Sequence, residues 1–144
     1  NRLSHAGSKT YANWHEQVLQ RFAEKQPEFG AIWLTYYPNI MVEWYPHVLV
    51  ISTALPKGPE NCTVTTEFYY PEDIVWFEPE FIEAEQKAYF ETAVEDDEIC
   101  YRMHEGRKAL WLRGESETGP YQSPTEDGMQ HFHEFYRRKM GRFL

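Results

Sequence analysis

The sequence predicts an α+β domain in which long helices pack on one face of a curved antiparallel sheet. A helical pattern comes first, at residues 9–25. Segments rich in β-branched and aromatic residues follow, at 31–36, 40–45, 48–55 and 62–70. Two long helical patterns close the chain. A run of strands followed by a run of helices is typical of α+β folds.

The first half of the chain supplies one helix and a meander of strands. Residues 9–25 carry apolar side chains at helical spacing, and Pro27 closes that segment. The strands after it are separated by turn-forming residues, which are Pro38-Asn39, Pro46-His47 and Lys57-Gly58-Pro59-Glu60-Asn61. Because such short connections join neighbouring antiparallel strands, we expect consecutive strands to pair.

The second half begins with a long helix. Pro71 and Asp73 are expected to end the last strand, and Pro79 suits the first position of a helix that reaches about Met103. Residues 109–112 read as a short strand or an extended segment.

The clearest local signal precedes the last helix. Ser123 suits its N-cap, Pro124 its first position, and Glu126 the reciprocal partner of a capping box. The helix then carries an apolar stripe that we expect to pack onto the sheet, made of Met129, Phe132, Tyr136 and Met140.

Composition narrows the class of protein. The 144 residues fit one compact domain, and 17% aromatic residues indicate a well-filled core or an aromatic-lined cavity. A net charge of −9 disfavours nucleic acid as a partner, and the cluster Arg137-Arg138-Lys139 with Arg142 suits a helix C-terminus. No apolar run is long enough to span a membrane, so no membrane partner is expected.

The two cysteines indicate the cellular compartment of the protein, and the first residue indicates whether the chain has been shortened. Cys62 and Cys100 are too few for a disulfide framework and lack metal-binding spacing, which predicts a cytoplasmic protein. The chain begins at Asn1 rather than Met, so we expect truncation or processing.

An acidic run, at residues 95–98, interrupts the apolar pattern of the helix predicted at about 80–103. At about 100° per residue, Asp96 lies at the centre of an arc of small and apolar residues, with Glu95 and Asp97 at its edges. The arc holds Phe81, Ile82, Ala88, Tyr89, Thr92, Ala93, Ile99, Cys100 and Met103. A buried carboxylate must be protonated, paired or metal-bound, so Asp96 is a candidate ligand. A paired structural acid and a helix that breaks near Val94 are the alternatives.

Four motifs, taken together, resemble the catalytic domain of the large subunit of Rieske non-haem iron oxygenases, the ring-hydroxylating family, over about residues 31–141. They are the aromatic-Pro-Asn strand pair with a closing Tyr-Pro at Tyr36–Pro46, the Pro-x-Gly-Pro turn at Leu55–Pro59, Val94-Glu95-Asp96 followed by Cys100 and Gly106, and the closing helix motif at Gly119–Tyr136. The family usually has Gln where this chain has His104.

The resemblance implies a helix-grip domain enclosing a mononuclear Fe(II) held by two histidines and one acid. By position that acid is Asp96, with Asp97 as the less favoured choice. Neither the family's closely spaced histidine pair nor the ligands of its [2Fe–2S] cluster occur here. Residues 1–144 are therefore expected to be a single-domain C-terminal fragment lacking the upstream Rieske domain.

The six histidines of this chain are not predicted to be iron ligands. They show no helical His-x-x-x-His pairing and are His5, His15, His47, His104, His131 and His133. His131 and His133 are expected to be one solvent-facing and one helix-packing residue, because they lie about 200° apart on a helix.

The family's activity is hydroxylation or oxidative demethylation of an aromatic or quaternary-amine substrate with O2. Electrons come from NAD(P)H through a reductase or ferredoxin and the cluster. The resemblance also implies a homotrimer. The substrate cavity would be lined from the sheet by Trp33, Met41, Val50 or Ser52 and from the helix near Thr92. We expect the isolated chain to be folded but inactive. The alternative is a non-catalytic helix-grip module that binds a hydrophobic ligand.

Overall fold

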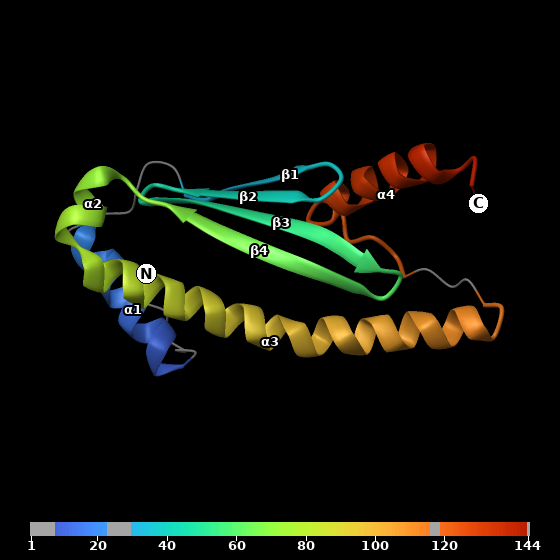
Figure 1. Ribbon diagram of the computed structural model, residues 1–144, viewed down its shortest axis with the longest axis horizontal. Coiled ribbons are helices and arrows are strands. Elements are labelled where there is room, and N and C mark those ends of the chain that lie inside the picture. The colour runs from blue at the N-terminus through green and yellow to red at the C-terminus, as the bar shows by residue number, and fades with distance from the viewer. Residues whose placement is uncertain (1–7, 23–29, 116–118, 144) are drawn as a thin grey trace. The chain divides into compact units, whose positions relative to one another are not determined.

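A computed structural model describes residues 8–22, 30–115 and 119–143. The chain divides into two compact units, Asn1–Gly30 with Tyr70–Ser116, and Ala31–Tyr69 with Glu117–Leu144. The elements, drawn in Figure 1, are α1 (Lys9–Arg21), β1 (Ile32–Tyr36), β2 (Ile40–Tyr45), β3 (Val48–Gly58), β4 (Asn61–Tyr69), α2 (Glu72–Phe77), α3 (Pro79–Leu112) and α4 (Asp127–Met140). An antiparallel sheet with long helices confirms the predicted α+β class.

The sheet unit contains a four-stranded antiparallel meander in the order β1-β2-β3-β4. The four predicted strands are confirmed, although β3 runs on to Gly58 and shortens the predicted turn. Alternate residues Val48, Val50 and Ser52 of β3 are buried, as expected for a central strand with one covered face. Asn39 fixes the β1–β2 turn, because its side-chain amide donates a 2.9 Å hydrogen bond to the carbonyl of Ala54.

Within the sheet unit, α4 contacts the turn between β1 and β2, and two residues of its predicted apolar stripe stay exposed. Phe132 and Phe135 place their ring centroids 5.5 and 4.9 Å from that of Tyr37, in the β1–β2 turn. Met129 and Tyr136 of the stripe stay 51% and 48% exposed. The predicted packing of the stripe onto the sheet is therefore not what the described contacts show.

The predicted cap of this helix was placed too early. The helix begins at Asp127, and residues 123–126 form a turn. The carboxylate of Glu126 accepts a 2.6 Å hydrogen bond from the backbone N–H of Gln122, not from Ser123. Glu126 thus closes a turn and becomes the N-cap itself, which a capping-box pattern cannot distinguish from the predicted arrangement.

In the helical unit, ion pairs of Arg21 join the end of α1 to α2 and to the start of α3. Its guanidinium bonds to Glu78 and lies 3.4 Å from the carboxylate of Asp73. These bonds, that to Glu78 foremost, raise the pKa of Arg21. The helix predicted at 9–25 is confirmed as far as Arg21, and residues 23–25 lie outside the described part.

A short helix, α2, occupies the stretch that was predicted only as the end of a strand. It has six residues, and Ile74 on its inner side is completely buried, at 0% exposure. Phe81, Ala84 and Ala88 of α3 are also buried, so they form the apolar core of this unit with Ile74. A helix this short contributes too few residues for a periodic pattern.

The long helix α3 has 34 residues and continues through Val94, which excludes the alternative of a helix that breaks there. The expectation of a strand or extended segment at 109–112 was wrong, because these residues form the last turn of α3. Beyond it, Gly114 N–H bonds to the carbonyl of Trp111 and Glu115 N–H to that of Leu110, both at 3.0 Å. This is a Schellman motif, in which Gly114 adopts φ 73°.

Two glycines of this helix are expected to respond oppositely to alanine. Gly114→Ala should lower the free energy of unfolding by about 1 kcal/mol, because a Cβ disfavours a left-handed backbone. Gly106→Ala should raise it by about 0.5–1 kcal/mol, since Gly106 is inside α3 and an added Cβ there meets nothing within 4 Å. Urea unfolding followed by circular dichroism measures both. Equal shifts of one sign would contradict the assigned cap.

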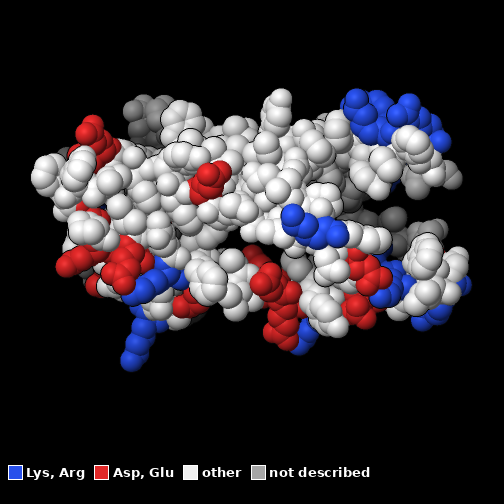
Figure 2. Space-filling view, in the orientation of Figure 1, with Lys and Arg blue, Asp and Glu red and all other residues white. Residues whose placement is uncertain are grey.

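Charge is unevenly distributed over the helices. Figure 2 shows Lys and Arg side chains gathered at the C-terminal end of α4, where Arg137, Arg138 and Lys139 form the last turn. This placement confirms the helix-terminus interpretation of the basic cluster. None of the helices in the described ranges has the length and apolar character needed to cross a bilayer.

Candidate functional site

The predicted metal ligand, Asp96, lies in an exposed stretch of α3. Every residue from 92 to 107 is exposed, and the structure therefore does not place Asp96 in an interior. Ile99 and Met103, on the same arc, are 59% and 61% exposed. The helical projection places these residues on one face of α3, but it does not show whether that face is covered.

Iron of the two-histidine, one-carboxylate kind needs three donors on one side of the ion. Within the described ranges, no group of three or more His, Cys, Asp and Glu side chains is arranged to hold a metal ion. The carboxylate of Asp96 has the right chemistry for one of these donors. The described residues alone do not fit a complete iron site, so the role of Asp96 stays a prediction.

The histidines are dispersed over both units. His15 lies on α1, His47 directly before β3, and His104 on the exposed part of α3. On α4, His131 is exposed with Nδ1 4.0 Å from the Glu134 carboxylate, and His133 is partly buried with Nδ1 2.5 Å from the hydroxyl of Tyr121. His5 lies outside the described residues. The two α4 histidines thus have the exposed and packed positions that were predicted for them.

The buried acid of α3 is Glu85, which the sequence analysis did not single out. It is only 5% exposed, one turn from Phe81 and from Ala88. Burial foremost, and then the negative charge of Glu85, raises the pKa of Tyr70. The position of Glu85, one helical turn from each of these two apolar residues, was the signal in the sequence that could have predicted its burial. Glu85 therefore corresponds to the paired structural acid that was considered for Asp96.

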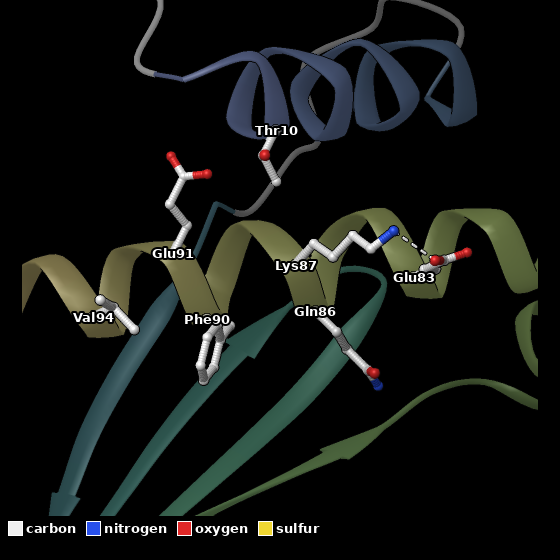
Figure 3. Close-up of a pocket in the computed structure, with 7 residues that line it drawn as sticks. All are labelled: Thr10, Glu83, Gln86, Lys87, Phe90, Glu91 and Val94. Atoms are coloured by element: carbon white, nitrogen blue, oxygen red, sulfur yellow. Dashed lines mark hydrogen bonds and ion pairs between the residues drawn. The ribbon is translucent and has the colours of Figure 1, made fainter.

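A groove runs between α1 and α3 in the helical unit (Figure 3). Its volume is about 640 Å³, and its lining residues are Thr10, Glu83, Gln86, Lys87, Phe90, Glu91 and Val94. Lys87 Nζ lies 2.6 Å from Glu83 Oε1 across one helical turn. This ion pair lowers the pKa of Glu83, through the hydrogen bond from Lys87 foremost. The predicted sheet residues of the cavity belong to the other unit and do not line this groove.

One face of the sheet carries a carboxylate among aromatic rings. Trp33, Glu43, Val50 and Phe68 are directly paired across the four strands and share that face. The hydroxyl of Tyr45 donates a 2.7 Å hydrogen bond to Glu43 Oε2 and accepts one of 3.2 Å from Trp33 Nε1. Glu43 and Tyr45 are partly buried, whereas Trp33 is 73% exposed. We call Trp33, Glu43 and Tyr45 the Glu43 cluster.

The fold class and the four motifs define a catalytic domain of the oxygenase type, and comparison with known proteins makes the assignment specific. The family model described as "Ring hydroxylating alpha subunit (catalytic domain)" matches residues 1–142. The chain therefore belongs to this family, which confirms the resemblance inferred from the motifs. No solved structure matches the chain.

Three curated relatives are similar over most of the chain. A putrescine 2-hydroxylase of Bordetella bronchiseptica is 61% identical over 139 residues, covering 96% of this chain and 32% of that protein. A putrescine 2-hydroxylase of Ralstonia nicotianae is 62% identical over 138 residues, covering 96% and 38%. The chloroplastic choline monooxygenase of Amaranthus tricolor is 28% identical over 103 residues, covering 72% and 22%. The chain thus spans about a third of the length of the first two relatives.

Proposed function

We propose that the protein containing this chain is an O2-dependent oxygenase that hydroxylates an aliphatic amine, with putrescine as the first substrate to test. The proposal includes a mononuclear non-haem Fe(II) and a Rieske [2Fe–2S] cluster as cofactors. NAD(P)H is the electron source, through a reductase or ferredoxin. Asp96 is the carboxylate ligand of the iron, and the histidine ligands lie outside this chain.

The observation that carries this proposal is the identity of 61% over 139 residues with a putrescine 2-hydroxylase. An identity this high over 96% of the chain supports a shared reaction. The three relatives described above are all named for amines, which favours an amine over the aromatic substrates that the family also uses. The alternative reaction on an amine is oxidative demethylation of a quaternary amine.

The test uses the complete polypeptide, loaded with iron and cluster and supplied with its reductase and NAD(P)H. Putrescine should stimulate oxygen uptake, and the product should contain one oxygen atom from isotopically labelled dioxygen. Choline serves as the comparison substrate for the demethylating or quaternary-amine reaction. A loaded protein that binds putrescine and leaves it unchanged would contradict the proposed hydroxylation.

Assembly and location are further parts of the proposal. We propose that the complete protein is a homotrimer, as the family resemblance implies, and that it works in the cytoplasm. Cys62 and Cys100 are both free and exposed, which supports a reducing compartment. Sedimentation of the complete polypeptide measures the assembly.

A further inference from the structure

One face of the sheet is apolar and yet exposed. Residues directly paired across an antiparallel sheet share a face, and successive residues of a strand alternate between faces. The pairs Ile32–Trp44, Trp44–Leu49 and Leu49–Tyr69 therefore form a row across all four strands, on the face opposite to Val50. We call this the Trp44 face. Its members on β1, on β2 and between Val48 and Ile51 of β3 are Ile32, Leu34, Tyr36, Ile40, Val42, Trp44, Leu49 and Ile51.

This part of the Trp44 face has the composition of a covered surface. Its eight side chains include no charged or amide group. Leu34, Tyr36 and Trp44 are nevertheless 56%, 72% and 60% exposed. An antiparallel sheet that meets water on one face normally carries polar residues there, and large exposed apolar patches mark interaction surfaces. The described residues thus leave open a face that is built to be covered.

The strand β1 adds a second, independent feature at the same place. It lies at an edge of the sheet, because among the described residues it pairs with β2 only. Natural edge strands are protected from further pairing by charged side chains, proline or bulges. The sequence of β1, Ile-Trp-Leu-Thr-Tyr, has neither charge nor proline, its five pairs with β2 are in continuous register, and all five residues are exposed. The outer N–H and C=O groups of β1 are therefore open to a further strand.

The length of the relatives indicates what occupies both surfaces. This chain covers 32% and 38% of the two putrescine 2-hydroxylases, so about two thirds of a polypeptide of that length lies outside it. A strand from the same polypeptide pairs without the loss of translational and rotational freedom that a separate molecule would undergo. A second copy fits less well, because two β1 edges paired with each other form an isologous contact, which closes a dimer and not the proposed trimer.

We propose that a strand from outside residues 1–144 of the same polypeptide pairs with the outer edge of β1, and that the segment carrying this strand covers the Trp44 face. The sheet of the complete protein then has a fifth strand beside β1. The sheet residues expected to line the substrate cavity all lie on the other face, and they are Trp33, Met41, Val50 and Ser52. The cover therefore leaves that face free for the substrate. This inference rests on the length of the complete polypeptide in the proposed function, but not on its activity.

Hydrogen exchange on the complete, loaded protein tests the edge. In an antiparallel pair about half of the N–H groups of a strand point to its neighbour and about half point away. If β1 is paired on both sides, all five of its N–H groups should exchange at least about 100-fold more slowly than in an unstructured peptide. If about half of them exchange at the unstructured rate, as resolved residue by residue by mass spectrometry, the proposal is overturned.

Photo-cross-linking of the same protein identifies the cover. Tyr36→p-benzoylphenylalanine places the reactive group on β1 and on the Trp44 face. The cross-linked product should keep monomer mass on a denaturing gel and should map by mass spectrometry to residues outside 1–144. A product of dimer mass would identify a second copy, and a cross-link within residues 1–144 would place the cover in this chain. Either result overturns the proposal, as does the absence of any cross-link in a folded variant.

The other end of the same face offers a matched control. On β4 this face carries Thr63, Thr65 and Glu67, all exposed, and is suited to water. Thr65→p-benzoylphenylalanine should therefore lose most of the cross-linked product. Equal yields from positions 36 and 65 would overturn the assignment of the cover to the β1 side. Should the Tyr36 variant not fold by circular dichroism, Trp44→p-benzoylphenylalanine tests the same face.

The two readouts are independent of turnover, so the inference and the proposed function fail separately. A protein that leaves putrescine unchanged but protects all N–H groups of β1 and gives the expected cross-link overturns the function alone. A protein that hydroxylates putrescine while the outer N–H groups of β1 exchange freely overturns the inference alone.

Discussion

Replacing Asp96 with alanine in the complete polypeptide is expected to abolish binding of the mononuclear iron. A site with two histidines and one carboxylate loses its anionic donor, and the affinity for Fe(II) should fall by more than the 10- to 100-fold (about 1.4–3 kcal/mol) that supporting residues contribute. Iron analysis after gel filtration measures the loss. The visible spectrum of the [2Fe–2S] cluster should not change, because the resemblance places its ligands outside this chain.

The neighbouring acid provides the control for this substitution. Asp97→Ala removes the same charge one residue along the same exposed stretch of α3, and should leave the iron content intact. If Asp96→Ala retains iron and Asp97→Ala loses it, the ligand is Asp97. Retention in both variants would move the search to Glu98 and would contradict the assignment of Asp96.

The strands and helices were predictable where local preference and tertiary packing agree. β-Branched and aromatic residues on either side of the turns at Pro38-Asn39 and Pro46-His47 predicted β1 and β2 to within one residue, and the start of β3, because those turns are where the chain reverses. The long helix followed from its periodic pattern and from Pro79 at its start. Both signals act over a few neighbouring residues.

Errors arose where a short segment supports two structures. Residues 109–112 are apolar and ambiguous between strand and helix, and the preceding turns of α3 decide the outcome by extending their hydrogen-bond ladder to Leu112. The helix α2 was missed because six residues carry little periodicity. Its stability depends on burying Ile74, which is a tertiary contact.

The sequence predicted the candidate site only as far as local patterns reach. Projection of the helix grouped Asp96 with Ile99 and Met103 on one face, and all three are exposed, as is every residue from 92 to 107. What covers a helix face is decided by distant residues, so periodicity alone cannot separate the buried Glu85 from the exposed Asp96. The Glu43 cluster depends on strand register, which brings Trp33 opposite Glu43 only once β1 and β2 are paired.

Replacing Ile74 with alanine is expected to lower the free energy of unfolding of the chain by about 2–5 kcal/mol, the range for deleting a buried aliphatic side chain. Ile74 is completely buried, at 0% exposure, and it joins α2 to the core that α3 forms with Phe81, Ala84 and Ala88. The substitution therefore leaves a cavity at the junction of two helices. Urea unfolding followed by tryptophan fluorescence measures the change.

The adjacent residue separates packing from helix propensity. Val75 lies on the same helix and is 50% exposed, so Val75→Ala should change the free energy of unfolding by only about 0.5 kcal/mol. Both substitutions introduce alanine into α2 and have similar effects on its intrinsic helicity. A large difference between them would show that α2 is held by the burial of Ile74. Equal effects would mean that the helical unit does not have the core described for it.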